Sequence, residues 1–246
     1  MSRLDWQIAT VLAITSETER VNTYTLRLPQ WTPHRAGQHY DLRLTAPDGY
    51  QTERSYSIAS PPEQIGEIAL TVELISGGEV SGYLYEGVAV GDKLEVRGPI
   101  GGYFVWPVDS VAAPLLLVAG GSGVVPLMAM LRHRQRAGLA NPVVLLFSVR
   151  SPDEVIYQRE LEALAQIDQI FTLLLTYTRR APVGWVGYRR RLDAAMLAEA
   201  RGYLPGPPQC YVCGPTSLVE KAATLLQAQG LPDNAIRTER FGPTGS

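Results

Sequence analysis

The chain has 246 residues, of which 46% are hydrophobic and 19% are charged, and its formal net charge is -2. This length exceeds the roughly 100 to 150 residues of most single domains, so we expect two domains of about equal size, and the composition excludes a disordered chain. The near-neutral charge excludes general attraction to nucleic acid or anionic membranes, because such binding needs clustered, unbalanced lysine and arginine.

The first part of the chain carries β-strand patterns. From Gln7 to about Gly98, short runs of β-forming residues are separated by proline and glycine, and the clearest runs are 23–28, 39–44 and 68–74. This punctuation predicts an antiparallel sheet closed into a small β-barrel.

From Ala113 onward, apolar strands are each followed by a helical segment. The predicted strand and helix pairs are 115–119 with 125–137, 143–148 with 153–166, 171–177 with 192–200, and 210–213 with 217–229. This alternation indicates a parallel, doubly wound, Rossmann-like sheet. The pattern changes between Val105 and Ala113, so we predict a β domain over 1–108 and an α/β domain over 109–246.

Within the β domain, Arg54, Ser55, Tyr56 and Ser57 stand together in a predicted strand. A flavin site needs a cation for its pyrophosphate, a flat ring against the isoalloxazine, and a small hydroxyl near the reactive edge. Because strand side chains alternate, Arg54 and Tyr56 share one face, and Ser57 reaches the flavin only if the strand bends. We predict a flavin site here; the alternative is an ordinary exposed strand.

A glycine loop follows at residues 77–81 and leads into a short predicted helix. Glycine lets the backbone approach a phosphate, and a helix N-terminus presents free N–H groups to it. We predict that Gly78, Val80 and Ser81 meet the FAD pyrophosphate opposite Arg54. The alternative is a simple Gly-Gly turn capped by Ser81.

A second glycine loop opens the α/β domain directly after its first strand. Gly120, Gly121, Ser122 and Gly123 occupy the place of a first strand–helix turn that binds a dinucleotide pyrophosphate, although the strict G-x-G-x-x-G pattern is absent. We predict that Gly121, Ser122 and Gly123 contact the nicotinamide nucleotide.

Arginines follow the next two predicted strands, at Arg150 and Arg179. An arginine there suits a 2′-phosphate, whereas an acidic residue suits the free 2′-hydroxyl of NAD. The first acidic residues after the second strand are Asp153 and Glu154. We therefore predict NADPH, with NADH still possible; the alternative is that these arginines only solvate strand ends.

The two cysteines of the chain are Cys210 and Cys213. Two thiols exclude a disulfide framework and a four-thiolate iron–sulfur cluster within this chain, and we predict no metal site. A redox pair remains an alternative. We expect Cys213 to pack at the end of the fourth strand. Because this is the edge where ligands bind in open α/β sheets, its thiol is also a candidate to face the nicotinamide.

The C-terminal segment carries Glu239 and Phe241 after an apparent last strand. We predict that Phe241 covers the flavin face opposite Tyr56 and that Glu239 sits near the nicotinamide amide or relays a proton. The alternative is a tail docked for stability. No apolar run is long enough to span a bilayer, and residues 1–10 hold no long apolar stretch, so we interpret the protein as soluble and cytoplasmic.

Taken in order, these segments resemble the ferredoxin–NADP(+) reductase superfamily, and more narrowly the stand-alone bacterial FAD-binding oxidoreductases similar to the flavin half of oxygenase reductases. The resemblance covers nearly the whole chain. It is carried by residues 37–38, 54–57, 77–81, 98–101, 120–126, 213–215 and 239–241.

The resemblance implies an FAD-binding β-barrel followed by an NAD(P)-binding α/β domain. By this likeness Arg54, Tyr56 and Ser57 hold the flavin, and Val72 and Glu73 line it through the main chain.

The same resemblance implies an FAD-dependent NAD(P)H oxidoreductase. It moves a hydride from NADPH to FAD and then single electrons to a ferredoxin-type or oxygenase partner, with Ser57, Cys213 and Glu239 as the catalytic candidates. Two alternatives stay open: reduction of a diffusible acceptor such as free flavin or a ferric chelate, and a non-catalytic redox sensor that binds flavin and nucleotide.

Overall fold

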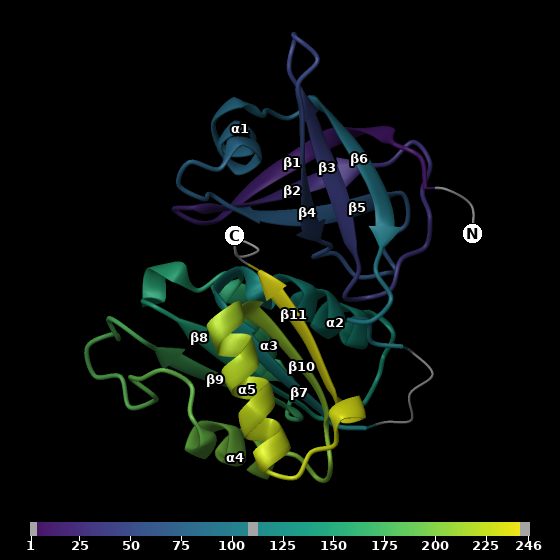
Figure 1. The fold of residues 1–246 in the computed structure, drawn as a ribbon. Helices are drawn as coiled ribbons and strands as arrows, with labels where there is room; N and C mark the ends of the chain where they lie inside the picture. The colour runs from purple at the N-terminus through teal and green to yellow at the C-terminus, as the bar shows by residue number, and fades with distance from the viewer. Residues whose placement is uncertain (1–3, 108–112, 242–246) are drawn as a thin grey trace. The chain divides into compact units, whose positions relative to one another are not determined.

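The computed structural model describes residues 4–107 and 113–241 and divides into two compact units (Figure 1). The first unit contains the described residues up to Pro107 together with Met128–Ala137, and the second contains the other described residues. The domain boundary predicted after Val108 lies outside the described residues and stays a prediction. In these two ranges, no helix is both long and apolar enough to cross a membrane.

The first unit is an antiparallel sheet of six strands in the order β4-β3-β6-β1-β2-β5, which confirms the predicted fold of this part of the chain. Helix α1 lies between β5 and β6 in the chain. The elements are β1 (Gln7–Thr18), β2 (Val21–Arg27), β3 (His39–Thr45), β4 (Gln51–Ser57), β5 (Glu67–Glu73), α1 (Glu79–Gly87) and β6 (Lys93–Ile100).

Strands β4 and β5 stand at the two ends of this strand order and approach each other at one point. An isolated bridge joins Ile58 to Leu70, and the Ala59 N–H donates to the Ala69 carbonyl over 2.7 Å. Along the rest of β4, the edge that faces away from β3 has no strand partner among the described residues. The barrel therefore has a seam beside β4.

Period-two burial explains why these segments form a barrel. Tyr40 and Leu42 on β3 are fully buried, whereas their neighbours Asp41 and Arg43 lie on the outer face. Burial of each large apolar side chain contributes roughly 1.5–3 kcal/mol. The barrel core is built from such alternating residues, including Tyr24, Leu26, Ile68, Leu70, Leu94 and Val96.

The second unit is a parallel sheet of five strands in the order β11-β10-β7-β8-β9, as predicted. Its strands are β7 (Leu115–Gly120), β8 (Val143–Val149), β9 (Phe171–Tyr177), β10 (Gln209–Pro215) and β11 (Ile236–Phe241). Its α-helices are α3 (Gln158–Ile167), α4 (Ala194–Gly202) and α5 (Thr216–Ala228), and its short 3₁₀ turns are η1 (Gly121–Gly123), η2 (Pro152–Glu154) and η3 (Asp233–Ala235). Helix α2 (Val124–Arg136) follows η1 in the chain, and its residues from Met128 onward belong to the first unit.

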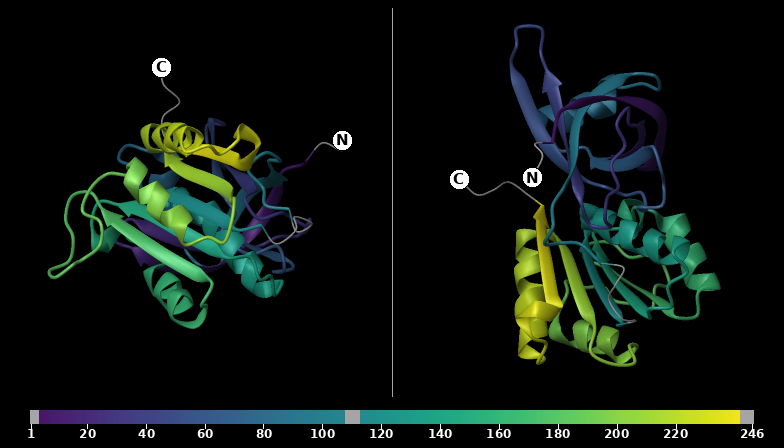
Figure 2. Two further views of the ribbon diagram at one scale, coloured as in Figure 1. Left: turned by 90° about the horizontal axis from the view of Figure 1, so that it is seen from below. Right: turned by 90° about the vertical axis from the view of Figure 1, so that its right-hand side faces the viewer.

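Every residue of β7 and β8 is buried, which explains why these strands read as continuous apolar runs instead of alternating patterns. Figure 2 shows α4 and α5 on one face of this sheet and α3 on the other. The core under α4 and α5 joins Leu116 and Val118 of β7 to Met196 and Val219.

Two helices begin later than their sequence patterns predict. The helix expected over 153–166 begins at Gln158, because Pro152–Glu154 form a 3₁₀ turn and Tyr157 adopts a left-handed conformation (φ 59°) that an α-helix cannot include. The helix expected over 192–200 begins after Asp193, whose carboxylate accepts the Met196 N–H at 2.9 Å as an N-cap.

Candidate functional site

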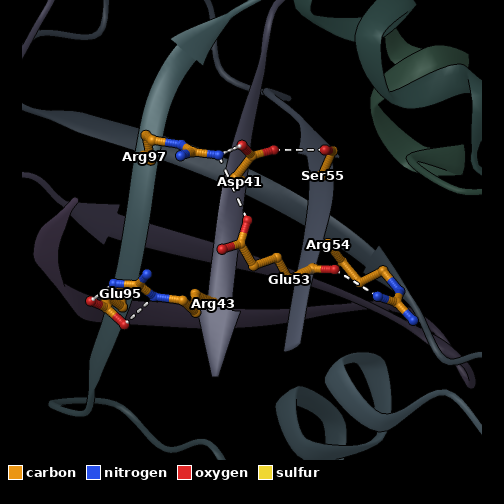
Figure 3. Close-up of polar contacts among 7 residues, drawn as sticks. All are labelled: Asp41, Arg43, Glu53, Arg54, Ser55, Glu95 and Arg97. Carbon is orange, nitrogen blue, oxygen red and sulfur yellow. Dashed lines mark hydrogen bonds and ion pairs between the residues drawn. The ribbon is translucent and has the colours of Figure 1, made fainter. Parts of the chain in front are cut away.

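The predicted flavin-binding residues lie on β4, beside the seam of the barrel. Register pairs place Arg54 opposite Leu42 and Tyr56 opposite Tyr40, so Arg54 and Tyr56 share one face of β4 as predicted. Figure 3 shows Ser55 turned toward Asp41 and Arg54 extending to the other side of the strand. The seam thus presents a cation and an aromatic ring two residues apart.

Arg54 and Tyr56 differ in burial, as a site that binds both a phosphate and a ring requires. Arg54 is exposed, donates from Nη1 to the Glu53 carbonyl at 2.6 Å, and forms no ion pair within the described residues. Tyr56 packs against the barrel core, and burial raises the pKa of its hydroxyl to about 12. Its ring therefore stays neutral at physiological pH, while Arg54 keeps a guanidinium available for a phosphate.

The two serines of this segment have different surroundings. The Ser55 hydroxyl donates to Oδ1 of Asp41 at 2.7 Å, so this side chain is already engaged by the protein. Ser57 ends β4, is 4% exposed, and its Oγ has no hydrogen-bond partner. A buried hydroxyl without a partner costs about 1–3 kcal/mol. Register alternation places Ser57 on the face of β4 opposite Tyr56, at the last residue of the strand, so the bend that would bring its hydroxyl to a flavin on the Tyr56 face stays a prediction. A flavin edge reached in this way would supply the missing hydrogen-bond partner.

The glycine loop before α1 presents its main chain, not its side chains. Gly78 is the N-cap of α1, and the first-turn N–H groups of a helix have no intrahelical partner. Val80 is 1% exposed and packs into the barrel core. The Ser81 hydroxyl accepts the Ile75 N–H at 3.2 Å and donates to the Gly78 carbonyl at 3.3 Å. Any contact of Val80 or Ser81 with a pyrophosphate therefore uses their N–H groups.

Val72 and Glu73 end β5, the other strand of the seam. Val72 is 3% exposed and belongs to the barrel core, whereas Glu73 is partly exposed. Their predicted main-chain contacts with a flavin stay a prediction.

In the second unit, the strand order reverses between β7 and β10. The chain runs from β7 to β8 on one side and returns to β10 on the other. In open parallel sheets, ligands bind outside the carboxyl ends of the two strands at such a switch point. The turn Gly121–Gly123 follows β7, and Cys213, Gly214 and Pro215 end β10, so both predicted loops lie at this position.

The two loops approach each other so closely that Gly123 has no room for a side chain. A Cβ atom on Gly123 would lie 2.2 Å from the Cys213 carbonyl oxygen and 2.4 Å from its carbonyl carbon. The main chain after β7 therefore packs directly on the main chain at the end of β10. The N–H groups of η1, with the partly buried Ser122 among them, are left at the switch point.

Cys213 and Glu239 are register partners on β10 and β11, although 26 positions separate them in the sequence. Burial raises the pKa of the Cys213 thiol well above its ordinary value, and the Glu239 carboxylate raises it further. Burial also raises the pKa of Glu239 to about 7. The thiol thus stays protonated, and the carboxyl group holds a proton that it can release near neutral pH.

Replacing Glu239 by glutamine is expected to stabilise the protein by about 2 kcal/mol at about pH 8 and to change its stability little at about pH 5. The folded pKa of about 7 exceeds the ordinary value of 4.5, so the stability that protonation gives is complete at low pH and is lost as pH rises through 7. Urea unfolding at both pH values measures this difference. An equal change at the two values would contradict the assignment.

Cys210 and Cys213 do not form a redox pair in this fold. They are three residues apart on β10, so their side chains point to opposite faces of the sheet, and both are buried and free. Burial raises the pKa of Cys210 to about 12. Cys210 belongs to the core under α4 and α5, so it acts in packing.

Arg150 and Arg179 are brought together at the ends of β8 and β9. The N–H groups of Arg179 and Arg180 donate to the Arg150 carbonyl at 3.0 and 2.9 Å. Both Arg150 and Arg179 are exposed, and neither has an ion pair within the described residues. Arg180 instead forms an ion pair with Asp153. Two guanidinium groups therefore remain available for an anionic ligand beside these strand ends.

Phe241 ends β11, is partly buried, and has Pro215 as its register partner. Its predicted place over a flavin, like that of the nicotinamide near the flavin, involves both units and stays a prediction. The residues after Phe241 lie outside the described range.

Asp41 and Arg97 contribute to the surroundings of the flavin segment and were not among the predicted site residues. Asp41 accepts a hydrogen bond from Ser55 and another from Arg97. Alternation along the run 39–44 places Asp41 on the outer face of the sheet, but pairing with Ser55 depends on strand register, which the sequence pattern does not specify.

Comparison with known protein families matches each part of the chain to a cofactor-binding domain of oxidoreductases. Residues 9–105 match the oxidoreductase FAD-binding domain, and residues 117–224 match the oxidoreductase NAD-binding domain. Ferredoxin–NADP reductase B of Sorangium cellulosum is 35% identical over 211 residues, which cover 84% of each chain.

Two further matches are a longer relative and a more distant solved structure. The glycine betaine monooxygenase reductase subunit of Pseudomonas aeruginosa is 34% identical over 85% of this chain and 56% of its own length, so the chain spans about half of that relative. A solved ferredoxin NADP+ reductase from Neisseria gonorrhoeae, with bound FAD and NADP, has a TM-score of 0.81 and 21% identity over 96% of this chain and 98% of its own. This likeness supports the fold.

Proposed function

Because the chain belongs to the ferredoxin–NADP reductase family and contains its FAD-binding and NAD-binding domains in order, we propose that it is a flavoprotein reductase that passes electrons from NADPH through FAD to a separate acceptor protein. The observation that carries this proposal is the buried Ser57 hydroxyl, left without a partner beside Tyr56 and Arg54 at the barrel seam. A flavin bound at this seam would supply the hydrogen-bond partner that the Ser57 hydroxyl lacks.

In this proposal the barrel holds FAD by three kinds of contact. Tyr56 packs its ring on the isoalloxazine, Arg54 neutralises a pyrophosphate charge, and Ser57 bonds to the flavin edge. The N–H groups at the start of α1 bind the same pyrophosphate. Bound FAD supplies the redox chemistry, because it accepts two electrons from a reduced nicotinamide and releases them singly.

The second unit binds the nicotinamide nucleotide at its switch point. The N–H groups of Gly121, Ser122 and Gly123 bind the pyrophosphate, and Arg150 and Arg179 bind the 2′-phosphate. Cys213 shapes the nicotinamide site as a neutral thiol, since burial keeps its pKa high. Glu239, with a pKa of about 7, holds a proton beside Cys213 and keeps negative charge low in this site.

Replacing Arg150 and Arg179 together with alanine is expected to raise KM for NADPH by about 10- to 100-fold, because both guanidinium groups lose their contacts with the 2′-phosphate. KM for NADH should change little. Steady-state reduction of ferricyanide with each nucleotide measures the two constants. Arg180→Ala is the matched control, because this exposed guanidinium already pairs with Asp153. A parallel loss with NADPH and NADH would overturn the choice of NADPH.

The acceptor is proposed to be a ferredoxin-type protein or an oxygenase component, as the names of the relatives suggest. Purified ferredoxins, free flavin and a ferric chelate offered separately with NADPH test this choice. Turnover that is fastest with a ferredoxin supports a protein acceptor. Turnover fastest with free flavin or the chelate indicates a diffusible acceptor, and bound flavin without turnover toward any acceptor indicates a redox sensor.

A further inference from the structure

Two rows of polar side chains cross the outer face of the barrel beside the flavin segment (Figure 3). Each row joins register partners on β4, β3 and β6, in that order. The Asp41 row consists of Ser55, Asp41 and Arg97, and the Arg43 row consists of Glu53, Arg43 and Glu95. Charges alternate along the rows, so each side chain lies beside a partner of opposite or neutral charge.

The Asp41 row is a continuous chain of hydrogen bonds. Asp41 accepts from Ser55 Oγ at Oδ1 and from Arg97 Nη2 at Oδ2, both over 2.7 Å. The Asp41 side chain is 14% exposed. Burial alone would raise its pKa, but the bonds from Arg97 and Ser55 outweigh burial and hold the pKa below the ordinary value. The carboxylate is therefore charged at neutral pH and keeps both bonds.

The Arg43 row has a stronger ion pair but lies farther along the strands from Tyr56. Arg43 and Glu95 form two hydrogen bonds, of 2.9 and 2.5 Å. Trp6 covers both rows, with the guanidinium carbons of Arg43 and Arg97 at 4.1 and 4.6 Å from its ring centroid. The two rows share a cover and are similar in exposure, and an ion pair of 3.6 Å between Arg97 and Glu53 links them. Glu95, which pairs with Arg43, is therefore the control position within the Arg43 row.

The Asp41 row acts on the residue between the two flavin-binding side chains. Ser55 is the residue that separates Arg54 from Tyr56, and successive side chains of a strand point to opposite faces, so a bond that fixes Ser55 also limits the directions open to its two neighbours. Within the part of the chain that the structure describes, β4 pairs with a strand on one edge only, β3, and the Ile58 bridge to Leu70 comes just after β4 ends. A side-chain bond from Ser55 to β3 therefore resists twisting of β4 at the point where the opposite face presents Arg54 and Tyr56.

We propose that Asp41 is a positioning residue for FAD: by holding Ser55 to β3 and β6, it fixes the orientation in which Arg54 and Tyr56 face the flavin. This inference rests on the proposed function, since it assumes that FAD binds on the Arg54 face. Asp41 itself lies on the outer face and does not touch the cofactor.

The test is FAD affinity, measured by titrating FAD fluorescence with flavin-free protein. Asp41→Ala is expected to weaken FAD binding by about tenfold, the effect of losing one hydrogen bond to a charged group. Ser55→Ala should weaken FAD binding by the same factor. The double variant should bind FAD as tightly as either single variant, because each single substitution already removes the contact between Asp41 and Ser55. The visible circular dichroism of bound flavin should change in all three variants.

Two further variants separate positioning from general destabilisation. Asp41→Asn keeps an oxygen that accepts from Ser55 and should restore affinity to within about threefold of the wild type. Glu95→Ala removes the ion pair of the Arg43 row. It should lower the melting temperature about as much as Asp41→Ala does, without altering FAD affinity or the dichroism of bound flavin. Unchanged affinity in Asp41→Ala, or an equal loss in Glu95→Ala, would overturn the inference.

Failure of this inference and failure of the proposed function give different results. If the wild type binds FAD and Tyr56→Ala loses it while Asp41→Ala does not, only the positioning role is wrong. If the wild type binds no FAD, the proposed function is wrong as well.

Discussion

Replacing Tyr56 with alanine is expected to weaken FAD binding by about 30-fold, which corresponds to roughly 2 kcal/mol of lost stacking. The reason is that Tyr56 is the aromatic side chain on the Arg54 face of β4 and its ring is anchored in the barrel core. An anchored ring loses little conformational freedom when it binds a flat ligand. Equilibrium titration of flavin-free protein with FAD measures the change.

Tyr56→Phe is the matched control, because it keeps the ring and removes the hydroxyl. Burial raises the pKa of this hydroxyl to about 12, so the wild-type ring is already uncharged and the phenylalanine variant should retain FAD within about threefold of wild-type affinity. Unchanged flavin content in Tyr56→Ala, or equal losses in both variants, would count against a stacking role.

Replacing Gly123 with alanine is expected to destabilise the second unit by about 3 kcal/mol and to raise KM for the nicotinamide nucleotide by about 100-fold. The added Cβ would lie 2.2 Å from the Cys213 carbonyl oxygen, and a backbone oxygen in a packed strand cannot move aside as a flexible side chain can. The loop after β7 must therefore separate from the end of β10. Chemical unfolding and steady-state kinetics measure the two effects.

Gly121→Ala is the control for the Gly123 variant within the same turn. Gly121 has a φ of +53°, but a Cβ there would meet nothing within 4 Å. Alanine at this position should cost only about 1 kcal/mol, the strain of a left-handed conformation. A Gly123→Ala protein as stable as Gly121→Ala would show that the close approach of the two loops is not required.

The fold and the face of β4 that carries Arg54 and Tyr56 follow from local patterns. Alternation with period two assigns these two side chains to one face, and strand–helix alternation after residue 113 implies the parallel sheet. The glycines of 120–123 and the Gly214-Pro215 pair, each at the end of a predicted strand, then indicate where the two loops of the switch point lie. These features depend on neighbours in the sequence, which is why the sequence alone is sufficient for them.

Other features depend on register between distant strands and could not be derived from the sequence. Cys213 and Glu239 become neighbours only because β11 pairs with β10, and the high pKa of Glu239 comes from burial in that pair. Ser81 is predicted to meet the pyrophosphate or, alternatively, to cap its helix. The hydrogen bonds of its hydroxyl with Ile75 and Gly78 depend on the shape of the loop, which the sequence pattern does not specify. The contact between Ser55 and Asp41 likewise follows from the pairing of β4 with β3.

The most direct test of the central claim is anaerobic mixing of the FAD-loaded protein with NADPH and, separately, with NADH, while the visible absorbance band of oxidised flavin is recorded in a stopped-flow instrument. We expect rapid bleaching of this band with NADPH and slower bleaching with NADH. Faster bleaching with NADH would keep the reductase and overturn the roles of Arg150 and Arg179. A protein that cannot be loaded with FAD, or a flavin that neither nucleotide reduces, would contradict the proposed function.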